Sequence, residues 1–462
     1  MELRTSLEKK VLRRIRPKKR DIDHIQFVAD YLVKAVDNSG VAQGMLVGSV
    51  ARHTWLNGDR DLDIFMLFDP TLSRLELEEK GLSLARSIAT DFGTSYQEKY
   101  AEHPYINAQI EGFDVDLVPC FRVSNAQEIK SAVDRTPFHT RYIAERIGTL
   151  ADDVLLFKQF AKAGGFYGSD QMTEGVAGYL CELLILHYGG FSPLLRATSQ
   201  WKKHTFIDIE GIAAKQFEDP LVVIDPVDPN RNVAASVSLT KKFEFVELAR
   251  GYLEDPSPLF FEVKENLILR REEFETAVSE RGTTLLALLF STPPYIPDVV
   301  VPQLRKSLTG IRDHLERNGF LVNRADYSMN ERQCMLLFEL LSDRLPPLKR
   351  HIGPPLWSKE NAAKFSSKIR PSTFSGPFIE DGTYIIEIPR TYTSARDLLS
   401  SKELLQTGLG KHIKLAMTEN WTTHEGKDCW HEDFDSFLSN FIIKLSPLMS
   451  LHRWQKQKKR GQ

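Results

Sequence analysis

A glycine–serine turn ahead of two aspartates is the part of this sequence best suited to chemistry. Gly48 and Ser49 follow the apolar run Met45-Leu46-Val47, and Arg52 comes shortly after them. A glycine where a strand runs into a helix lets the backbone pass close to a phosphate, and Ser49 adds a hydroxyl and a helix-start amide. We expect Arg52 to project from the first helical turn, where its guanidinium and the helix dipole act on the same anion. Such a turn suits a triphosphate.

Two carboxylates follow this turn on one predicted strand. Asp61 and Asp63 alternate with Leu62 and Ile64, so both aspartates point to one face of the strand while the apolar residues enter the core. Two carboxylates on one face repel each other unless cations lie between them. Magnesium is the expected cation, because hard oxygen ligands and substrate phosphates suit it better than they suit zinc.

A second alternating segment offers the third carboxylate that such a site requires. Asp114 and Asp116 lie on one face of the predicted strand Phe113–Pro119, and Glu111-Gly112 is a plausible two-residue hairpin turn ahead of it. Spacing alone does not choose between Asp114 and Asp116. We expect three acidic side chains from two adjacent strands to converge beside the serine-bearing turn.

This order of motifs resembles the polymerase-beta-like nucleotidyltransferase superfamily, and longer stretches are similar to archaeal-type (class I) CCA-adding enzymes, the tRNA nucleotidyltransferases. The longer stretches are GSVARHTWLNGDRDLDIF from Gly48, DVDLVPCFRV from Asp114, RTPFHTRYI from Arg135, FKQFAKAGGFYGSD from Phe157, GYLCELLILHYGGF from Gly178 and DPVDPNRNVAAS from Asp225. Weaker similarity continues through PPYIPDVVVPQLRK and HIGPPLWSKENAAKF, so the resemblance covers nearly the whole chain.

The resemblance implies a role for each matched residue. The metal-binding carboxylates are matched by Asp61, Asp63 and Asp116. Contacts to the triphosphate are matched by Gly48, Ser49 and Arg52, and further nucleotide contacts by His139, Lys158 and Tyr167. The arginine that helps to select C and A over G and U is matched by Arg231. One departure is Gly175-Val176-Ala177-Gly178, where the family usually has Gly-Phe-Ser-Gly, so local packing there is open.

The implied reaction is template-independent addition of CCA to the 3′ end of tRNA from CTP and ATP, with release of pyrophosphate. Asp61 and Asp63 would bridge two Mg²⁺ ions, and Asp116 would mainly hold the ion that lowers the pKa of the attacking hydroxyl. Phosphate charge would be offset by Arg52, Lys158 and His139. A poly(A) polymerase or other RNA-tailing enzyme would share every carboxylate but would accept ATP alone. A non-catalytic RNA-binding protein is the third hypothesis, which the mutual repulsion of three carboxylates disfavours.

Several of these residues also have purely structural interpretations. His139 could be a histidine satisfied within the fold, and Arg231 could merely pair with Asp225 or Asp228. Lys158 and Tyr167 could lie at the core edge of a helix with their polar tips pointing outward.

The bulk composition is that of a globular protein with a balanced charge. The chain has 462 residues, a hydrophobic content of 42% and a net charge of −2, so RNA binding must depend on local patches. Basic clusters occur at 13–20 and among Arg453, Lys456, Lys458, Lys459 and Arg460, where a solvated face or frayed tail is an alternative to phosphate binding. Widely spaced cysteines, no secretory signal and no membrane-length apolar run predict a cytoplasmic protein. The oligomeric state stays open, a homodimer included.

The segment pattern predicts an α/β and α+β multidomain chain. A helix from about Asp23 precedes the catalytic strands, and the resulting domains are 1–140, a nucleotidyltransferase catalytic domain; 141–258, a helical central nucleotide-binding domain; and 259–462, an α/β C-terminal tRNA-binding region. In the central domain the pattern predicts a helix over 179–188 and a loop over 219–229. In the C-terminal region it predicts a helix over 302–319, strands over 334–340 and 383–388, and turns at 351–355.

Overall fold

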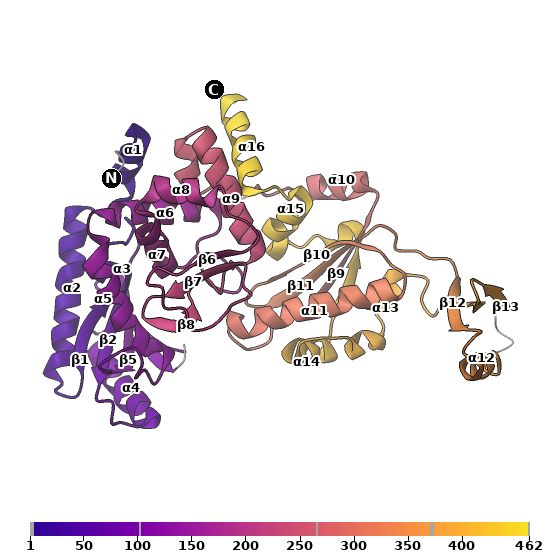
Figure 1. Ribbon diagram of the computed structural model, residues 1–462, viewed down its shortest axis with the longest axis horizontal. Coiled ribbons are helices and arrows are strands. Elements are labelled where there is room, and N and C mark those ends of the chain that lie inside the picture. Colours follow the sequence, from indigo (N-terminus) through magenta and orange to yellow (C-terminus); the bar gives the residue numbers. More distant parts are fainter. Residues whose placement is uncertain (1–3, 101–102, 265–266, 370–373, 461–462) are drawn as a thin grey trace. The chain divides into compact units, whose positions relative to one another are not determined.

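The computed structural model describes residues 4–100, 103–264, 267–369 and 374–460, without the side chains of residues 454 and 456–460. The chain divides into two compact units (Figure 1). The first unit is Met1–Lys264 together with Leu445–Gln462, and the second is Glu265–Lys444. The predicted domains 1–140 and 141–258 therefore share one unit, and the predicted region 259–462 divides between both.

A five-stranded sheet with two helices on one face begins the first unit. Its strands run in the order β1-β2-β5-β4-β3, and only β2 and β5 pair in parallel. Apolar residues of α2 and α4 pack on one face with alternate residues of β2 and β5, such as Leu62 and Val115. The strands are β1 (Gln43–Val47), β2 (Asp61–Phe68), β3 (Tyr96–Tyr100), β4 (Pro104–Ile110) and β5 (Phe113–Phe121); the helices are α2 (Lys19–Asn38), α3 (Gly48–Ala51) and α4 (Arg74–Asp91).

The predicted connections around this sheet are largely confirmed. Glu111 and Gly112 have φ angles of 50° and 82° and join β4 to β5, as expected for a two-residue hairpin whose central residues are left-handed. Helix α2 begins four residues earlier than about Asp23, at Lys19, but its apolar stripe is buried as expected. The helix after β1 has only four residues, so Arg52 is the residue that ends α3.

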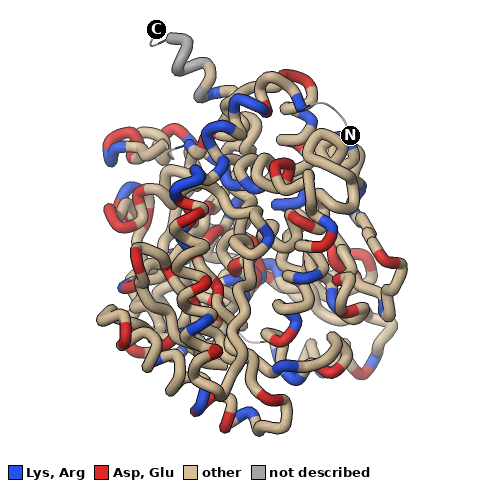
Figure 2. Tube along the Cα trace, turned by 90° about the vertical axis from the view of Figure 1, so that its left-hand side faces the viewer, with Lys and Arg blue, Asp and Glu red and all other residues tan. Residues whose placement is uncertain are grey.

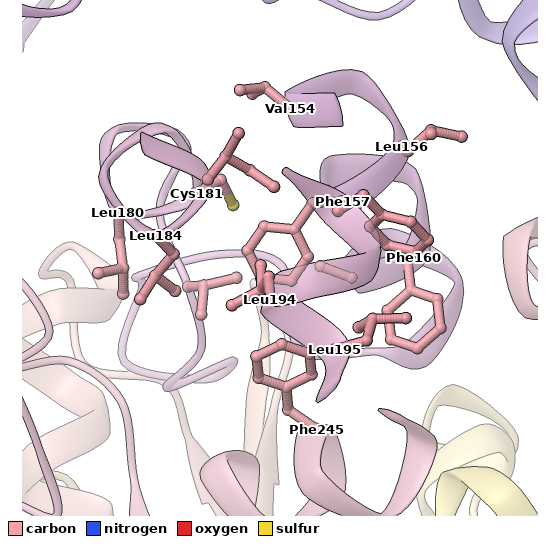
Figure 3. Packing of buried hydrophobic residues seen from close by; sticks show 14 of the residues in the cluster. Val154, Leu156, Phe157, Phe160, Leu180, Cys181, Leu184, Leu194, Leu195 and Phe245 are labelled. Atoms are coloured by element: carbon pink, nitrogen blue, oxygen red, sulfur yellow. The ribbon is translucent and has the colours of Figure 1, made fainter. Parts of the chain in front are cut away.

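Helices form most of the rest of the first unit, around an aromatic core. Phe157 and Phe160 of α6 pack against Leu184 of α7, Leu194 of α8 and Phe245 of α9 (Figure 3). Helix α7 confirms the prediction for 179–188 and ends at Gly189, which has a left-handed φ of 79°. The helices are α5 (Thr136–Ile147), α6 (Ala151–Gly164), α7 (Gly178–Tyr188), α8 (Phe191–Thr198), α9 (Leu239–Glu254) and α16 (Pro447–Arg460).

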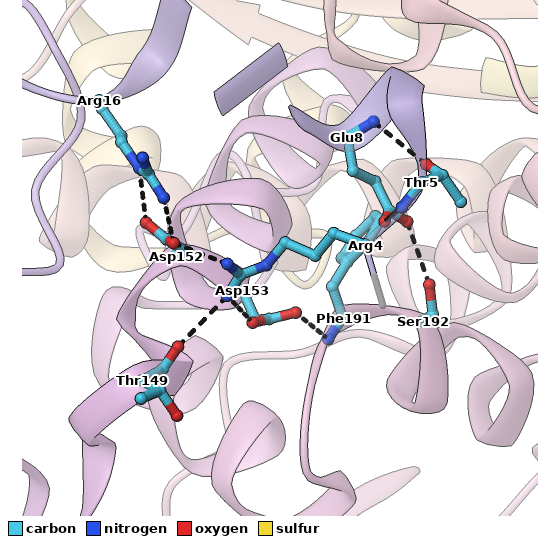
Figure 4. Close-up of polar contacts among 9 residues, drawn as sticks. All are labelled: Arg4, Thr5, Glu8, Arg16, Thr149, Asp152, Asp153, Phe191 and Ser192. Carbon is cyan, nitrogen blue, oxygen red and sulfur yellow. Dashed lines mark hydrogen bonds and ion pairs between the residues drawn. The ribbon is translucent and has the colours of Figure 1, made fainter. Parts of the chain in front are cut away.

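The N-terminal helix α1 (Ser6–Ile15) belongs to this helical core although it precedes the sheet in sequence. Val11, Leu12 and Ile15 are buried with the residues of α6 and α8. Polar contacts reinforce the packing: Arg4 donates to Asp152 over 2.7 Å, Arg16 pairs with Asp152, and Ser192 donates to Glu8 over 3.1 Å (Figure 4). Arg16, a member of the N-terminal basic cluster, thus forms an ion pair within the chain, although its side chain is 48% exposed.

A small sheet contradicts the loop predicted over 219–229. It contains β6 (Thr205–Ile207), β7 (Leu221–Asp225) and β8 (Asp228–Asn232) in that order. Every residue of β7 is buried, so its apolar run outweighs the nearby prolines: Pro220 and Pro226 flank β7, and Pro229 lies on β8. The loop prediction is wrong, and Arg231 lies on a strand.

The second unit contains a four-stranded sheet, ordered β10-β11-β9-β15, with helices on both faces. Alternate residues of β9 enter two separate cores: Leu286 and Leu288 pack toward α11 and α14, whereas Leu285 and Leu289 pack toward α10 and α15. The elements are α10 (Arg271–Arg281), β9 (Thr284–Ser291), α11 (Pro297–Arg317), β10 (Val322–Met329), β11 (Gln333–Leu340), α13 (Ala395–Leu399), α14 (Lys411–Glu419), β15 (Thr422–Glu425) and α15 (Asp435–Ile443).

Two boundary predictions in this unit are wrong. Helix α11 starts at Pro297, five residues before the predicted start at Pro302, which lies inside the helix. Pro297 occupies the first helical position, where a proline is well tolerated. Residues 351–355 are not turns but part of β12 (Leu348–Pro355), which pairs with β14 (Thr383–Pro389) beside β13 (Ser375–Glu380) and α12 (Lys359–Ser366). The strands predicted over 334–340 and 383–388 are confirmed as β11 and β14.

Two further expectations concern the surface and the thiols. Within the residues described, none of the helices combines the length and the apolar character needed to cross a membrane. The four cysteines are free and buried. Basic and acidic positions are interspersed over the trace in Figure 2, consistent with the net charge of −2.

Candidate active site

The aspartates of β2 and β5 face each other across the central strand pair. The parallel register aligns Asp61 with Asp114 and Asp63 with Asp116, so the four carboxylates form two adjacent rows on one face. These carboxylates lie on the face opposite α2 and α4. Further along β5 on the same face, Val118 belongs to a second, small hydrophobic core. The predicted adjacency of carboxylates from two strands is therefore confirmed.

The electrostatics of these carboxylates are unfavourable without a cation. Burial, together with the charges of Asp116 and Asp61, raises the pKa of Asp63 to about 6. Burial likewise raises the pKa of Asp116, and burial with the charges of Asp59 and Asp114 raises that of Asp61. A divalent cation with hard oxygen ligands would remove this repulsion, so the donor chemistry fits magnesium.

The carboxylate of Asp63 lies against the glycine of the turn. Gly48 has a left-handed φ of 73°, and a Cβ built on it would lie 2.0 Å from Oδ2 of Asp63. Glycine is thus required both for the turn conformation and for the close approach of this carboxylate. From the sequence we expect this glycine to serve the approach of a phosphate; the contact with Asp63 is a second reason, which the sequence does not reveal.

A three-carboxylate ligand set is not preformed. Among the described residues, no three Asp, Glu, His or Cys side chains are arranged to hold one metal ion. Asp116 and Asp114 instead both accept hydrogen bonds from the amide of Asn107, at 2.6 and 2.5 Å. The expected convergence on one point is therefore not seen, because the amide between the two like charges gives each a favourable partner.

Arg52 is buried and points into the helical core. Its Nε donates to Oε1 of Glu182 over 2.9 Å, and its Nη1 donates to Oγ1 of Thr140 over 3.3 Å. Thr54 donates to the same Glu182 oxygen over 2.5 Å. The guanidinium of Arg52 is therefore held by residues of α5 and α7. The dipole of α3, which we expect from the sequence to act beside it, contributes little because the helix has only four residues.

Lys158 lies close to this pair. Its Nζ is buried and donates to the backbone oxygen of Thr54 over 2.8 Å, and burial lowers its pKa while Glu182 opposes the shift. The ammonium group of Lys158 is therefore buried, and the interpretation that its tip points outward is wrong. Lys162, one helical turn further, pairs with Asp59 over 2.8 Å and lies over the ring of Tyr167.

His139 and Arg231 share one buried carboxylate. Oδ2 of Asp225 lies 2.8 Å from Nε2 of His139 and accepts a 2.7 Å hydrogen bond from Nη1 of Arg231. The hydroxyl of Tyr179 donates to Oδ1 over 3.2 Å, and its ring stacks on His139 with centroids 4.1 Å apart. Burial would raise the pKa of Asp225, but the hydrogen bonds from His139 and Arg231 hold it below its usual value.

An open cleft lies beside this cluster in the first unit. Its volume is about 620 Å³, within the range of small-molecule sites. Arg231 and Tyr179 line it together with Arg135, which pairs with Asp228 over 2.8 Å. Arg231 thus pairs with Asp225 and faces the cleft at the same time.

Models of three protein families match successive parts of the chain. The model described as "Nucleotidyltransferase domain" matches residues 30–139, "tRNA nucleotidyltransferase, second domain" matches 152–262, and "CCA-adding enzyme, C-terminal domain" matches 281–426. The CCA-adding enzyme of Methanoregula boonei is 55% identical over 439 residues, which cover 95% of this chain and 95% of that protein. The chain belongs to the CCA-adding enzyme family.

More distant members of the CCA-adding enzyme family align over a similar extent. The CCA-adding enzyme of Methanosarcina barkeri is 40% identical, covering 92% of this chain and 95% of that protein. The one from Haloarcula marismortui is 41% identical, covering 87% of this chain and 89% of that protein. The resemblance and the multidomain nucleotidyltransferase fold predicted from the sequence are confirmed.

The segment that departs from the usual sequence of CCA-adding enzymes is well packed. Val176 is buried and bridges to Tyr167, which lies beyond the end of α6 and not on a helix as one interpretation supposed. A Cβ on Gly175 would lie 2.0 Å from the backbone oxygen of Phe166, so the first glycine is required. Ala177, the third residue of this segment, lines the cleft.

The motifs of the sequence do not mark Asn107 or Glu182 as site residues, and they indicate Asp225 only as a possible partner of Arg231. Asn107, Glu182 and Asp225 hold other site residues by side-chain hydrogen bonds, but none carries a distinctive spacing. Glu182 had a usable signal, since a single carboxylate inside the apolar run Leu180–Leu186 predicts a buried charge with a partner.

Proposed function

We propose that this protein adds C, C and A in turn to the 3′ end of tRNA, using CTP and ATP and releasing pyrophosphate. The observation that carries the proposal is the 55% identity to a CCA-adding enzyme over 95% of both chains. It is supported by two adjacent rows of carboxylates beside a glycine turn, which supply oxygen donors of the kind that two-metal nucleotidyl transfer uses.

We assign the metal site to Asp61, Asp63 and Asp116, with Mg²⁺ as the metal and two ions as the number. Bound there, the ions would supply the charge that activates the 3′-hydroxyl and stabilises the departing pyrophosphate. The raised pKa of Asp63, about 6, supports this assignment because a cation would favour the charged form. Asp114 shares a row with Asp61 and is assigned no metal, since the matched family position is Asp116.

We assign the triphosphate to Gly48, Ser49, Arg52 and Lys158. Arg52 donates from Nε to Glu182 and from Nη1 to Thr140, and its other N–H groups remain available to phosphate oxygens. Lys158 donates one of its three N–H groups to the backbone oxygen of Thr54, and the other two remain available to phosphate oxygens. Their positions are fixed before binding, and preorganised charge is what phosphoryl transfer chiefly demands.

We assign further nucleotide contacts to His139 and Tyr167, and base choice to Arg231. Burial lowers the pKa of His139, with Asp225 opposing, and this direction favours the neutral ring. Its contribution would be hydrogen bonding and not the charge compensation expected from the sequence. Arg231 donates into the cleft, where a base that leaves its donors unpaired would be rejected strongly.

Nucleotide choice on truncated tRNA tests the proposal. The purified protein with MgCl₂ and tRNA lacking its CCA end is expected to add C, C and A from CTP and ATP, and nothing from GTP or UTP. Product length and composition are read on sequencing gels. Long runs of A alone would make the protein an RNA-tailing enzyme, and RNA binding without any extension would make it a non-catalytic RNA-binding protein.

We also propose a cytoplasmic location, where tRNA and nucleoside triphosphates are available. Whether the protein acts as a homodimer is tested by light scattering with and without tRNA, where twice the mass of the 52.7 kDa chain is the expected result for a dimer.

A further inference from the structure

The carboxylate of Asp225 connects two groups that otherwise belong to different parts of the site. Asp225 ends β7, Arg231 lies on β8, and His139 lies on α5. The carboxylate is fully buried, at 0% exposure, and its neighbours are donors from three elements. No other buried carboxylate among the described residues of the first unit contacts both an arginine and a histidine of the proposed site.

We propose that Asp225 is a positioning residue that sets Arg231 for base choice and His139 for nucleotide binding, so that both depend on one carboxylate. The proposal rests on the proposed function and deepens it. The ion pair between Arg231 and Asp225 is then compatible with base selection by Arg231, because the pair holds the guanidinium in place for that role.

The first step concerns the plane of the guanidinium. Arg231 is exposed at 38% of its side chain, and such a side chain has several rotamers open to it. The 2.7 Å bond from Nη1 to Asp225 fixes one edge of the group, so its remaining N–H donors keep a constant direction in the cleft. Fixed donors discriminate between bases, whereas mobile donors adapt to either.

The second step concerns the proton on His139. Asp225 is ionised, so its Oδ2 can only accept, and the neutral ring must carry its proton on Nε2. The other ring nitrogen is then left as an acceptor. Tyr179 stacks on the ring and donates to the second oxygen of Asp225, so the orientation of the imidazole is determined from two sides. Arg52 and Arg231 are the cations that face it.

The variant Asp225→Asn tests the proposal with little change of shape. Incorporation of each nucleotide into tRNA lacking its CCA end is measured at several concentrations. The kcat/KM ratio of CTP over UTP is expected to fall by roughly ten- to a hundredfold, because a charge-assisted hydrogen bond is lost from Arg231. KM for CTP should rise more than kcat falls.

Lys242→Met provides the matched structural control. Its Nζ is buried and donates to the backbone oxygens of Lys202 and Pro220, both over 2.7 Å, so it holds the opposite end of β7 from Asp225. We expect this variant to lower the melting temperature and to leave the CTP over UTP ratio within about twofold of wild type, as a site without contact to the nucleotide should.

Each outcome decides the matter. Lost discrimination in Asp225→Asn alone supports the proposal. Unchanged discrimination in Asp225→Asn, or equal losses in both variants, overturns it. If Asp225→Asn does not fold, Tyr179→Phe decides: it keeps the ring stack and removes one bond to Asp225, so a smaller loss of discrimination is expected and an unchanged ratio contradicts the proposal. Failure of the wild type to add CCA would instead contradict the proposed function.

Discussion

Asp63 in the first unit and Glu339 in the second are carboxylates with opposite surroundings. Asp63 lies beside Asp116 and near Asp61, and burial with these charges raises its pKa to about 6. Glu339 is 1% exposed and accepts hydrogen bonds from Arg281 and Arg324 at 2.5 and 2.9 Å. Burial would raise the pKa of Glu339, but these bonds lower it to about 2.

Under the proposed function, the difference separates a structural charge, Glu339, from a metal-binding one, Asp63. Thr283 and Asn323 complete the set of donors around Glu339, at 2.7 and 2.8 Å, so nothing further is required to stabilise its charge. Among the described residues, the only hydrogen-bond donor shared by the carboxylates of β5 is Asn107. A cluster of charges that its own fold does not neutralise indicates a site for a cation.

The largest expected effect is on catalysis. Asp63→Ala should lower the rate of nucleotide addition by roughly a thousandfold or more, because it removes a ligand from ions that contribute several kcal/mol to the transition state. Single-turnover addition of labelled CMP to truncated tRNA measures the rate, and filter binding is expected to show nearly unchanged tRNA affinity.

Asp114→Asn is the matched control for this variant, because Asp114 lies on the same face one row away. Its rate should stay within about tenfold of wild type if Asp116 is the third ligand. A rate in Asp63→Ala close to that of wild type would remove Asp63 from the site, and a rate as low in Asp114→Asn would exchange the roles of Asp114 and Asp116.

The next largest effect is on stability in the second unit. Glu339→Ala should lower the free energy of unfolding by about 3–5 kcal/mol, because two arginines lose their buried partner. Urea denaturation followed by circular dichroism measures the change. Glu387→Ala, at a partly exposed strand position, is expected to change it by less than about 1 kcal/mol. Equal losses in both variants would contradict the comparison.

The pH dependence of this stabilisation follows from the direction of the shift. The folded pKa of Glu339, about 2, lies below its ordinary value of 4.5. Its charge therefore stabilises the folded chain above about pH 4.5, and the contribution is lost as pH falls toward 2. The difference in unfolding free energy between wild type and Glu339→Gln should be constant from pH 7 to 5 and shrink below that. A difference that grows on acidification would contradict the ion pairing.

The sequence predicts the parts of this molecule that short-range patterns specify. The alternation around Asp61 and Asp63, the hairpin at Glu111-Gly112 and helix α7 are all confirmed, because period and turn chemistry act locally. The hairpin of β7 and β8 was missed, since its prolines and aspartates outweighed a short buried apolar run.

Side-chain partners were less accessible than the strands. Glu182 contacts Arg52 across 130 residues, and Asp225 contacts His139 across 86. Pairings at such separations are fixed by the packing of α5, α7 and β7, and no local pattern encodes them. The conformation of Asp116 was likewise missed, because it depends on Asn107 of a neighbouring strand.

The smallest effect provides the sharpest form of the comparison. In the presence of a chelator, Asp63→Asn should raise the free energy of unfolding by about 1 kcal/mol, because it removes a charge that Asp116 and Asp61 repel. With magnesium in excess the order should reverse, since ligand binding stabilises the wild type and the variant has lost a ligand. Thermal unfolding in EDTA and in MgCl₂ measures both differences. Glu339→Gln is the control, and its melting temperature should lie below that of wild type by the same amount in either buffer. A variant that follows wild type in both conditions would mean that Asp63 carries no metal, and that the repulsion among these carboxylates has no functional use.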